Sequence, residues 1–112
     1  MVQRLNLIAP TDCAVSMVTV YELFCGLAKA RDPAKERQKV ERFISAIIEL
    51  PLDRAGAEAA ANIRADLERL GTPIGPYDML IAGQALAGGL TLVTNNVREF
   101  QRVSGLKLES RP

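Results

Sequence analysis

Glu22, Asp78 and Asn96 are the polar residues of this sequence whose types and positions could carry chemistry. The chain contains no histidine, which excludes imidazole bases, the usual catalytic triads and the commonest nitrogen ligand of metal ions. Carboxylate and amide oxygens suit hard divalent cations such as Mg²⁺. The reaction that these residues favour is hydrolysis of a phosphodiester, in which a bound ion acidifies a water and neutralises charge on the phosphate.

Both carboxylates also have a purely structural interpretation. Glu22 stands three residues after Thr19, which is the spacing of a capping box at the start of a helix, and the local sequence alone favours that role. Asp78 could complement the dipole of a helix. A single charge in so apolar a segment needs a cation or several hydrogen-bond donors, however, so a functional role is favoured for Asp78.

The two asparagines after the apolar segment at 90–93 allow two interpretations as well. Asn95 and Asn96 could be turn residues, or one of them could cap a short helix through Arg98. A polar residue at the carboxyl end of a parallel strand could equally belong to a functional crevice, because ligands bind at that edge of open parallel sheets. The residues by themselves leave both interpretations open.

Composition narrows the class of protein. The chain has 14 basic and 13 acidic residues that are interspersed, so charge neither supports nor excludes an RNA partner. Cys13 and Cys25 lie in apolar surroundings without CxxC spacing, which indicates buried thiols in a reducing cytosol rather than a disulfide or a zinc site. The first nine residues match neither a secretory signal nor a membrane span. We expect a soluble, cytoplasmic protein.

Alternating strands and helices must position the candidate residues. A chain of 112 residues is long enough for one domain, over 1–112, and aromatic residues make up only 4% of it, so the core must consist mainly of Leu, Ile, Val and Ala. That composition suits helices packed on a parallel sheet. The apolar pattern predicts strands at 12–17, 90–93 and 106–108, helices at 19–31, 33–48, 53–70 and 77–87, and an extended connector or edge strand at 50–52.

Helix boundaries are marked by residues that cap or stop helices. Asp32 and Asp53 can each cap a helix start, and Gly71 and the Gly88-Gly89 pair can each end one. The 71–76 loop contains two glycines and two prolines, which fix its backbone path. We therefore expect an α/β fold, a three-layer α/β/α sandwich with a mostly parallel sheet.

Three motifs resemble, in order and spacing, those of the VapC-type toxins in the PIN-domain family. They are Ser16-x-x-Thr19-x-x-Glu22-Leu23-x-x-Gly26, Gly75-Pro76-Tyr77-Asp78-Met79-Leu80-Ile81-Ala82 and Leu92-Val93-Thr94-Asn95-Asn96-Val97-Arg98-Glu99-Phe100. Each motif alone is weak, but together they are specific. The resemblance covers about 12–109, and the Thr-Asn-Asn segment is similar to that of the tRNA-cleaving branch.

This resemblance implies a fold and an activity. It implies a PIN fold, an endoribonuclease that acts on structured RNA such as tRNA, Mg²⁺ or Mn²⁺ bound by acidic residues, and inhibition by a VapB-type antitoxin. We also expect a homodimer. Glu22 and Asp78 would then bind the metal, and Asn96 would complete the catalytic set. Residues that would contact substrate or orient water are Thr94, Asn95, Arg98 and Arg102.

The sequence departs from the family pattern at its start. The opening strand of the family ends in an Asp-Thr-Asn motif whose aspartate binds metal, and nothing before Cys13 resembles it. Residues 1–10 look instead like the end of the helix that follows that strand. We therefore expect a domain without its first strand, whose central gap is filled by a partner segment, strand exchange or a repacked dimer.

The missing aspartate gives a second hypothesis, of a different class. The chain could be a PIN scaffold that binds antitoxin or dimerises but no longer cleaves RNA, because too few carboxylates remain to hold the ion. A nucleotide-binding α/β domain is disfavoured, since no predicted strand is followed by GxGxxG or by a P-loop lysine motif.

Overall fold

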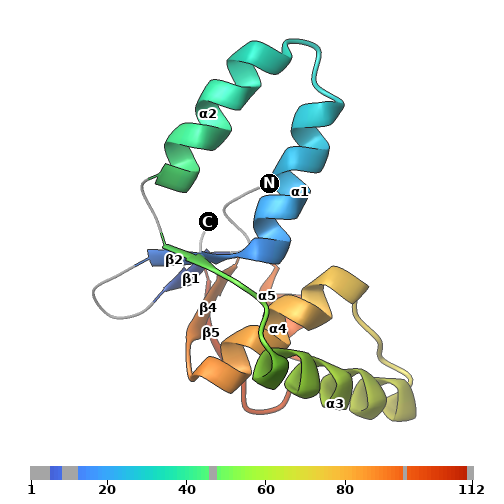
Figure 1. Ribbon diagram of the computed structural model, residues 1–112. Helices are drawn as coiled ribbons and strands as arrows, with labels where there is room; N and C mark the ends of the chain where they lie inside the picture. Colours follow the sequence, from blue (N-terminus) through green and yellow to red (C-terminus); the bar gives the residue numbers. More distant parts are fainter. Residues whose placement is uncertain (1–5, 9–12, 46–47, 95, 111–112) are drawn as a thin grey trace.

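The computed structural model describes residues 6–8, 13–45, 48–94 and 96–110. The elements in chain order are β1 (Asn6–Ile8), β2 (Cys13–Ser16), α1 (Met17–Ala28), α2 (Pro33–Ser45), β3 (Ile48–Leu50), α3 (Arg54–Leu70), α4 (Pro76–Gly88), β4 (Thr91–Thr94), α5 (Val97–Phe100) and β5 (Lys107–Ser110). In Figure 1 the hairpin of α1 and α2 stands above β1 and β2, whereas α3 and α4 lie below these two strands.

The strands form one sheet in the order β3-β2-β1-β4-β5. β2 pairs in parallel with β3, and β4 pairs in parallel with β5. β1 lies between the two pairs and is antiparallel to both of its neighbours, β2 and β4. All strands except β1 therefore run in the same direction among the described residues, which confirms the predicted α/β architecture with a mostly parallel sheet.

β1 corrects what we expected of the first ten residues. That stretch was interpreted as the end of a helix, but Asn6–Ile8 form a strand that pairs on both sides. The physical reason is backbone hydrogen bonding. Without β1, the inner edges of β2 and β4 would carry backbone N–H and C=O groups that have no partner strand. The central gap is thus filled by residues of the same chain rather than by a partner segment.

The start of α1 corrects a second expectation. Ser16, not Thr19, is the N-cap: its side chain accepts a hydrogen bond of 3.0 Å from the backbone N–H of Val18. The helix therefore begins at Met17, directly after β2, and Thr19 lies inside its first turn. A capping box between Thr19 and Glu22 is excluded, because a residue within the helix cannot cap it.

The predicted helix at 33–48 is too long at its end. α2 stops at Ser45, and Ile48 belongs to the edge strand β3, while Ile47 lies outside the described residues. The apolar spacing was compatible with a helix, but pairing of β3 with β2 determines the structure of this segment. The edge strand that was an alternative for 50–52 is confirmed, although it lies at Ile48–Leu50.

The remaining helix boundaries follow the sequence signals. Asp53 accepts from the backbone N–H of Gly56 at 2.8 Å, and the side chain of Asp32 accepts from Lys35. Gly71 and Gly89 end α3 and α4 in the left-handed conformation, with φ of 72° and 65°. These residues hold both ends of the loop that leads from α3 into α4.

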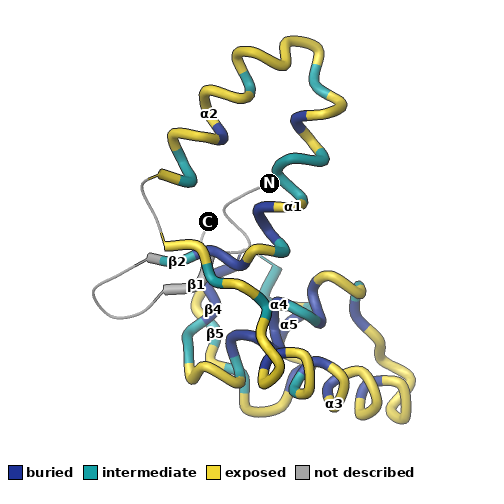
Figure 2. The backbone as a smooth tube through the Cα atoms, viewed as in Figure 1, coloured by how far each residue is buried: buried dark blue, intermediate teal, exposed yellow. Residues whose placement is uncertain are grey.

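The core lies between α3, α4 and the sheet. Figure 2 shows that burial is concentrated around α4 and the strands, that α1 is partly buried, and that α2 is mostly exposed. A close approach holds α4 in place: a Cβ on Gly83 would lie 2.5 Å from the backbone nitrogen of Ala60 in α3, so only glycine fits there. The core residues are Ile63, Leu67, Ile74, Met79, Ile81, Ala82, Ala85, Leu92, Phe100 and Val103.

Candidate active site

The candidate residues lie at the carboxyl ends of the strands. α1, with Glu22, follows directly after β2, and Asn96 leads from β4 into α5. Because β2 and β4 run in the same direction, these two strand ends lie at the same edge of the sheet. The N-terminus of α4 brings Asp78 to the segment after β4, because Gly75, just before α4, is hydrogen-bonded to Glu99 of α5.

Asp78 is buried in the first turn of α4, where its side chain is 6% exposed. A Cβ on Gly75 would lie 3.5 Å from Oδ2 of Asp78 and 3.9 Å from Oε2 of Glu99, so both carboxylates flank Gly75. The backbone N–H of Gly75 donates to Glu99 Oε2 at 2.9 Å. The structural alternative for Asp78 was an exposed carboxylate that complements the dipole of a helix. That interaction alone does not explain a carboxylate as buried as Asp78.

Asn96 is held by the residues on either side of it. Its backbone N–H donates to Oγ1 of Thr94 at 2.9 Å, and its side-chain Nδ2 donates to Oε1 of Glu99 at 2.5 Å. Asn96 occupies the N-cap position of α5, yet its side chain makes no capping bond there. The turn interpretation is thus correct for the backbone, while the side chain is directed to an acidic residue of the candidate site.

The α1 part of the site differs in its hydrogen bonding. Thr19 is 1% exposed, and its Oγ1 is buried without a hydrogen-bond partner among the described residues. Oε1 of Glu22 is likewise buried and unpartnered there. A buried carboxylate oxygen in this condition fits a cation or an ordered water as its partner.

α1 and α4 contact each other through the residues that precede the two carboxylates. The rings of Tyr21 and Tyr77 meet edge to face, with centroids 5.6 Å apart. Hydrogen bonding to Tyr77, and then to Cys25, raises the pKa of Tyr21 above its usual value, so this exposed phenol is neutral at physiological pH. This contact places the helix segments that carry Glu22 and Asp78 side by side.

The side chains of the site fit a hard cation that takes only a few of its ligands from the protein. Within the described residues, no three His, Cys, Asp or Glu side chains converge as a metal cluster. Mg²⁺ needs fewer than three, because it commonly keeps several waters and takes one or two carboxylates together with substrate phosphate. Glu22, with its unpartnered oxygen, and buried Asp78 can supply those carboxylates.

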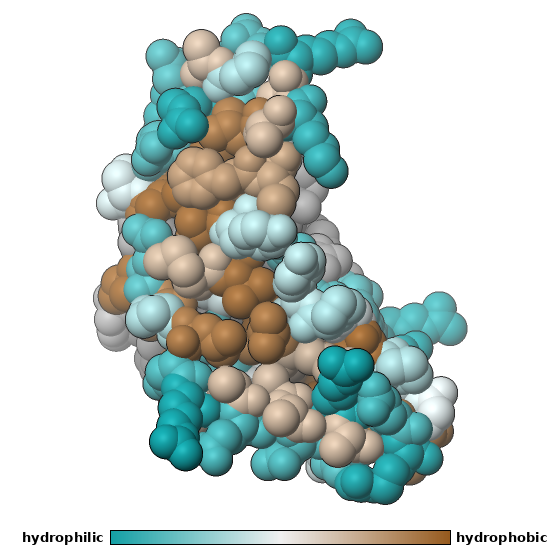
Figure 3. Space-filling view, turned by 45° about the vertical axis from the view of Figure 1, so that its right-hand side comes forward, coloured by the Kyte–Doolittle hydropathy of each residue, from teal (hydrophilic) through white to brown (hydrophobic). Residues whose placement is uncertain are grey.

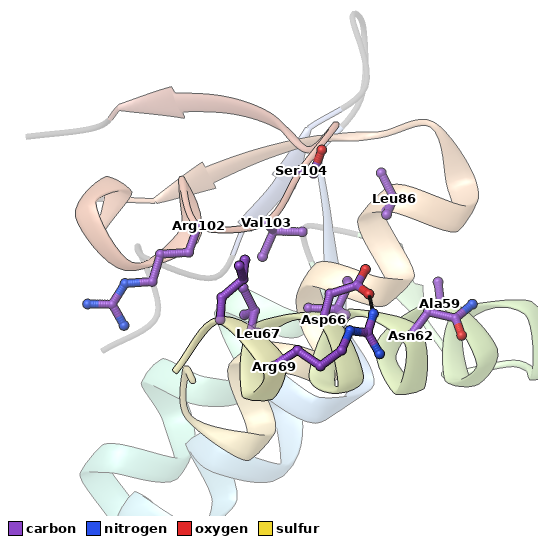
Figure 4. A pocket seen from close by; sticks show the side chains of 11 residues that line it. Ala59, Asn62, Asp66, Leu67, Arg69, Leu86, Arg102, Val103 and Ser104 are labelled. Atoms are coloured by element: carbon purple, nitrogen blue, oxygen red, sulfur yellow. Dashed lines mark hydrogen bonds and ion pairs between the residues drawn. The ribbon is translucent and has the colours of Figure 1, made fainter. Parts of the chain in front are cut away.

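The structure describes two of the three remaining predicted residues, Arg98 and Arg102. Arg98 is exposed on α5, and Asn95 lies outside the described residues. Arg102 donates to the carbonyl oxygen of Pro73 at 2.9 Å, so it supports the loop before α4. It also lines a cavity of about 450 Å³ beside α3, shown in Figure 4, in which Asp66 is paired with Arg69. That cavity contains none of the candidate carboxylates.

Glu99 is the site residue that the sequence analysis missed. It accepts from both Gly75 and Asn96 and so joins the start of α4 to the turn after β4. The available signal was its place three residues after Asn96, which is one helical turn and brings the two side chains together. Only the contact with Gly75, 24 residues away, could not be anticipated.

The fold and the site define a domain with acidic residues at the carboxyl edge of a mostly parallel sheet, and residues 2–106 match the PIN domain family. The chain belongs to that family. Among its relatives is the tRNA(fMet)-specific endonuclease VapC of Shigella flexneri, which is 45% identical over 107 residues, covering 96% of this chain and 80% of the relative. Ribonuclease VapC2 of Haemophilus influenzae is 39% identical over 107 residues, with the same coverage.

Solved structures agree with the fold. The DNA-bound VapBC from Salmonella typhimurium superimposes with a TM-score of 0.84 at 44% identity, over 87% of this chain and 74% of that one. VapBC2 from Rickettsia felis, bound to a promoter DNA fragment, gives a TM-score of 0.85 at 33% identity, over 88% and 74% of the two chains. The PIN-like fold and the VapC resemblance of the sequence are thereby confirmed.

Proposed function

We propose that this protein is a Mg²⁺-dependent endoribonuclease, the toxin of a VapBC-type toxin–antitoxin system, with tRNA as its substrate class. One observation carries the proposal. Buried Asp78 lies beside Gly75 and Glu99, next to the helix that carries the unpartnered oxygen of Glu22. The relatives, an endonuclease specific for tRNA(fMet) and a ribonuclease, support the same reaction.

Each residue of the site has a separate task in this proposal. Asp78 and Glu22 would hold the ion, which when bound would acidify a water and neutralise charge on the phosphate. Glu99 fixes the start of α4 through Gly75 and fixes the side chain of Asn96, so these groups are in place before substrate arrives. The Thr94 hydroxyl accepts from the Asn96 backbone and so sets the turn.

RNA would reach the site along exposed side chains that surround the carboxylates. Tyr21 and Tyr77 are 52% and 44% exposed and directly precede Glu22 and Asp78 in the sequence. Aromatic rings at such a place can stack on unpaired bases, and the exposed guanidinium of Arg98 can contact phosphate. Arg102 contributes less in this proposal, because its guanidinium supports Pro73.

A VapB-type antitoxin is the proposed protein partner. Figure 3 shows apolar side chains gathered in a band along one face of the molecule. A groove of about 430 Å³ between α1 and α4 includes the exposed residues Met17, Tyr21 and Tyr77, and exposed apolar surface of this kind favours a protein partner. Two related structures carry the name VapBC, for complexes solved with DNA.

We propose that the chain also forms a homodimer, which sedimentation of the purified protein would test.

The rival function, a PIN scaffold that binds antitoxin without cleaving RNA, has one observation in its favour. No three acidic, cysteine or histidine side chains converge in the part of the chain that the structure describes. A scaffold would bind Mg²⁺ only weakly, and the purified protein would leave RNA intact in its presence. Both hypotheses keep the same fold, so only cleavage and metal binding separate them.

The experiment that tests the proposal is cleavage of tRNA by the purified protein with Mg²⁺ and with EDTA. We expect Asp78→Asn to lower the Mg²⁺-dependent rate by at least about 100-fold, because the loss of a carboxylate ligand weakens an interaction worth several kcal/mol. The matched control is Asp66→Asn, an exposed aspartate on α3, which should cleave like the wild type. An unchanged rate in Asp78→Asn would remove Asp78 from the site, and no cleavage by the wild type would favour the scaffold.

A further inference from the structure

Two buried oxygens on one face of α1 lack partners in the part of the chain that the structure describes. They are Oγ1 of Thr19 and Oε1 of Glu22. Residues three apart on a helix lie on the same face, so the side chains that carry these two oxygens are neighbours. Thr19 is only 1% exposed, and bulk water therefore does not satisfy its hydroxyl.

The two oxygens do not satisfy each other. A direct hydrogen bond between them would have given both a partner, and none is present. A threonine within a helix usually donates to a carbonyl one turn earlier, and Thr19 does not do so. The Thr19 hydroxyl neither caps the helix nor bonds back to it, and the neighbouring Glu22 side chain also has a buried, unpartnered oxygen. A third group that bonds to both would satisfy the two oxygens together.

Gln84 provides an internal comparison. Its Oε1 is also buried without a partner, but its Nε2 donates to the carbonyl oxygens of Leu50 and Pro51, at 2.8 and 3.0 Å. The side chain of Gln84 thus has a structural role, as it connects α4 to the end of β3. The Thr19 hydroxyl has no such bond, so packing alone does not account for a hydroxyl at this position.

We propose that Thr19 is a positioning residue of the cation site. Its hydroxyl and Oε1 of Glu22 together hold one water, which has at least the two polar partners that a buried water needs. This water orients Oε1 of Glu22, so the carboxylate that would hold the cation is fixed in place before the ion binds. This inference rests on the proposed function, because it assigns a role within the same cation site.

The test compares Thr19→Val, which keeps the shape but removes the hydroxyl, with Thr19→Ser, which keeps the hydroxyl. Mn²⁺ serves as the probe, and its binding is measured by electron paramagnetic resonance on the full chain without RNA. Loss of a group that orients a ligand typically weakens metal binding 10–100-fold, so we expect Thr19→Val to lower Mn²⁺ affinity by about 10-fold. Thr19→Ser and the exposed-loop control Thr72→Val should bind like the wild type.

Thermal unfolding without metal distinguishes a positioning role of Thr19 from a structural one. Thr19→Val should melt at about the same temperature as the wild type, because the variant loses no hydrogen bond to another protein group. Wild-type Mn²⁺ affinity in Thr19→Val, with weaker binding in Asp78→Asn, would overturn this inference and leave the proposed function standing. Equal, weak binding by the wild type and Asp78→Asn would overturn both. Thr19→Ala replaces Thr19→Val if the valine variant does not fold.

Discussion

The two halves of the candidate site are built in opposite ways. On the side of α4 and α5, Glu99 accepts one hydrogen bond at each of its oxygens, and Asn96 donates through both its backbone and its side chain. On the side of α1, the hydroxyl of Thr19 and one oxygen of Glu22 are buried without partners among the described residues. One half is held by hydrogen bonds within the protein, whereas the other half leaves two buried oxygens without a partner among the described residues.

This difference explains how a small domain can keep an acidic site in place before a ligand is bound. In the half formed by α4 and α5, hydrogen bonds within the protein fix the backbone around Asp78. The geometry of this half is therefore set in the folded protein before a ligand binds. The α1 half buries polar oxygens at a cost, and a ligand that satisfies them would bind more tightly as a result. The same type of substitution should therefore have different effects in the two halves.

The largest effect on stability is expected from Glu99→Gln. A glutamine offers one acceptor and one donor group, so it cannot accept from both Gly75 and Asn96 as Glu99 does. The free energy of unfolding, measured with urea, should fall by about 1–3 kcal/mol because one part-buried donor loses its acceptor.

Glu68→Gln is the matched control for that experiment. Glu68 is exposed on α3 and pairs with Arg64 one turn away, so its substitution should change stability by less than about 0.5 kcal/mol. Equal losses in the two variants would contradict the view that the α4 and α5 half is held by Glu99.

A smaller effect is expected from Ser16→Ala, which tests how the other half is placed. Ser16 is buried, and its hydroxyl accepts from Val18 at the start of α1. Loss of such a cap costs about 1 kcal/mol in the free energy of unfolding. Ser104→Ala, at an exposed serine, should leave stability within about 0.5 kcal/mol. A neutral result for Ser16→Ala would mean that packing alone sets the start of α1.

The smallest effect is expected from Glu22→Gln in the absence of metal. Since Oε1 of Glu22 has no partner to lose, the free energy of unfolding should change by less than about 0.5 kcal/mol. Mn²⁺ affinity should nevertheless fall, because the carboxylate charge is gone. A loss of stability as large as that of Glu99→Gln would show that the two halves are built alike.

Much of the fold could be predicted from the sequence because its signals are local. The Asp53 cap, the left-handed Gly71 and Gly89, and the apolar segment of α4 all act within a few residues. The predicted start of α1 was wrong because Ser16, rather than Thr19, caps the helix. The predicted end of α2 was wrong because pairing of β3 with β2 overrode a helical pattern. β1 could not be anticipated at all, since its structure depends on the unpaired edges of β2 and β4.

The site was predictable to a similar extent. Asp78 was favoured because a charge stood alone in an apolar segment, and its burial agrees with that argument. The role of Glu99 depends on a hydrogen bond to Gly75 that spans 24 positions in the chain, which no local pattern encodes. The metal itself stays a prediction, supported by the unpartnered oxygen of Glu22.

β1 also acts as a spacer. Leu7 is paired with Ala14 on one side and with Leu92 on the other, so β2 and β4 are two strand spacings apart, about 10 Å. The α1 half follows from β2, and Asn96 and Glu99 follow from β4. Three residues without a charged side chain thus set the width of the site. Direct pairing of β2 with β4 would narrow that width by about 5 Å, more than any hydrogen bond could absorb.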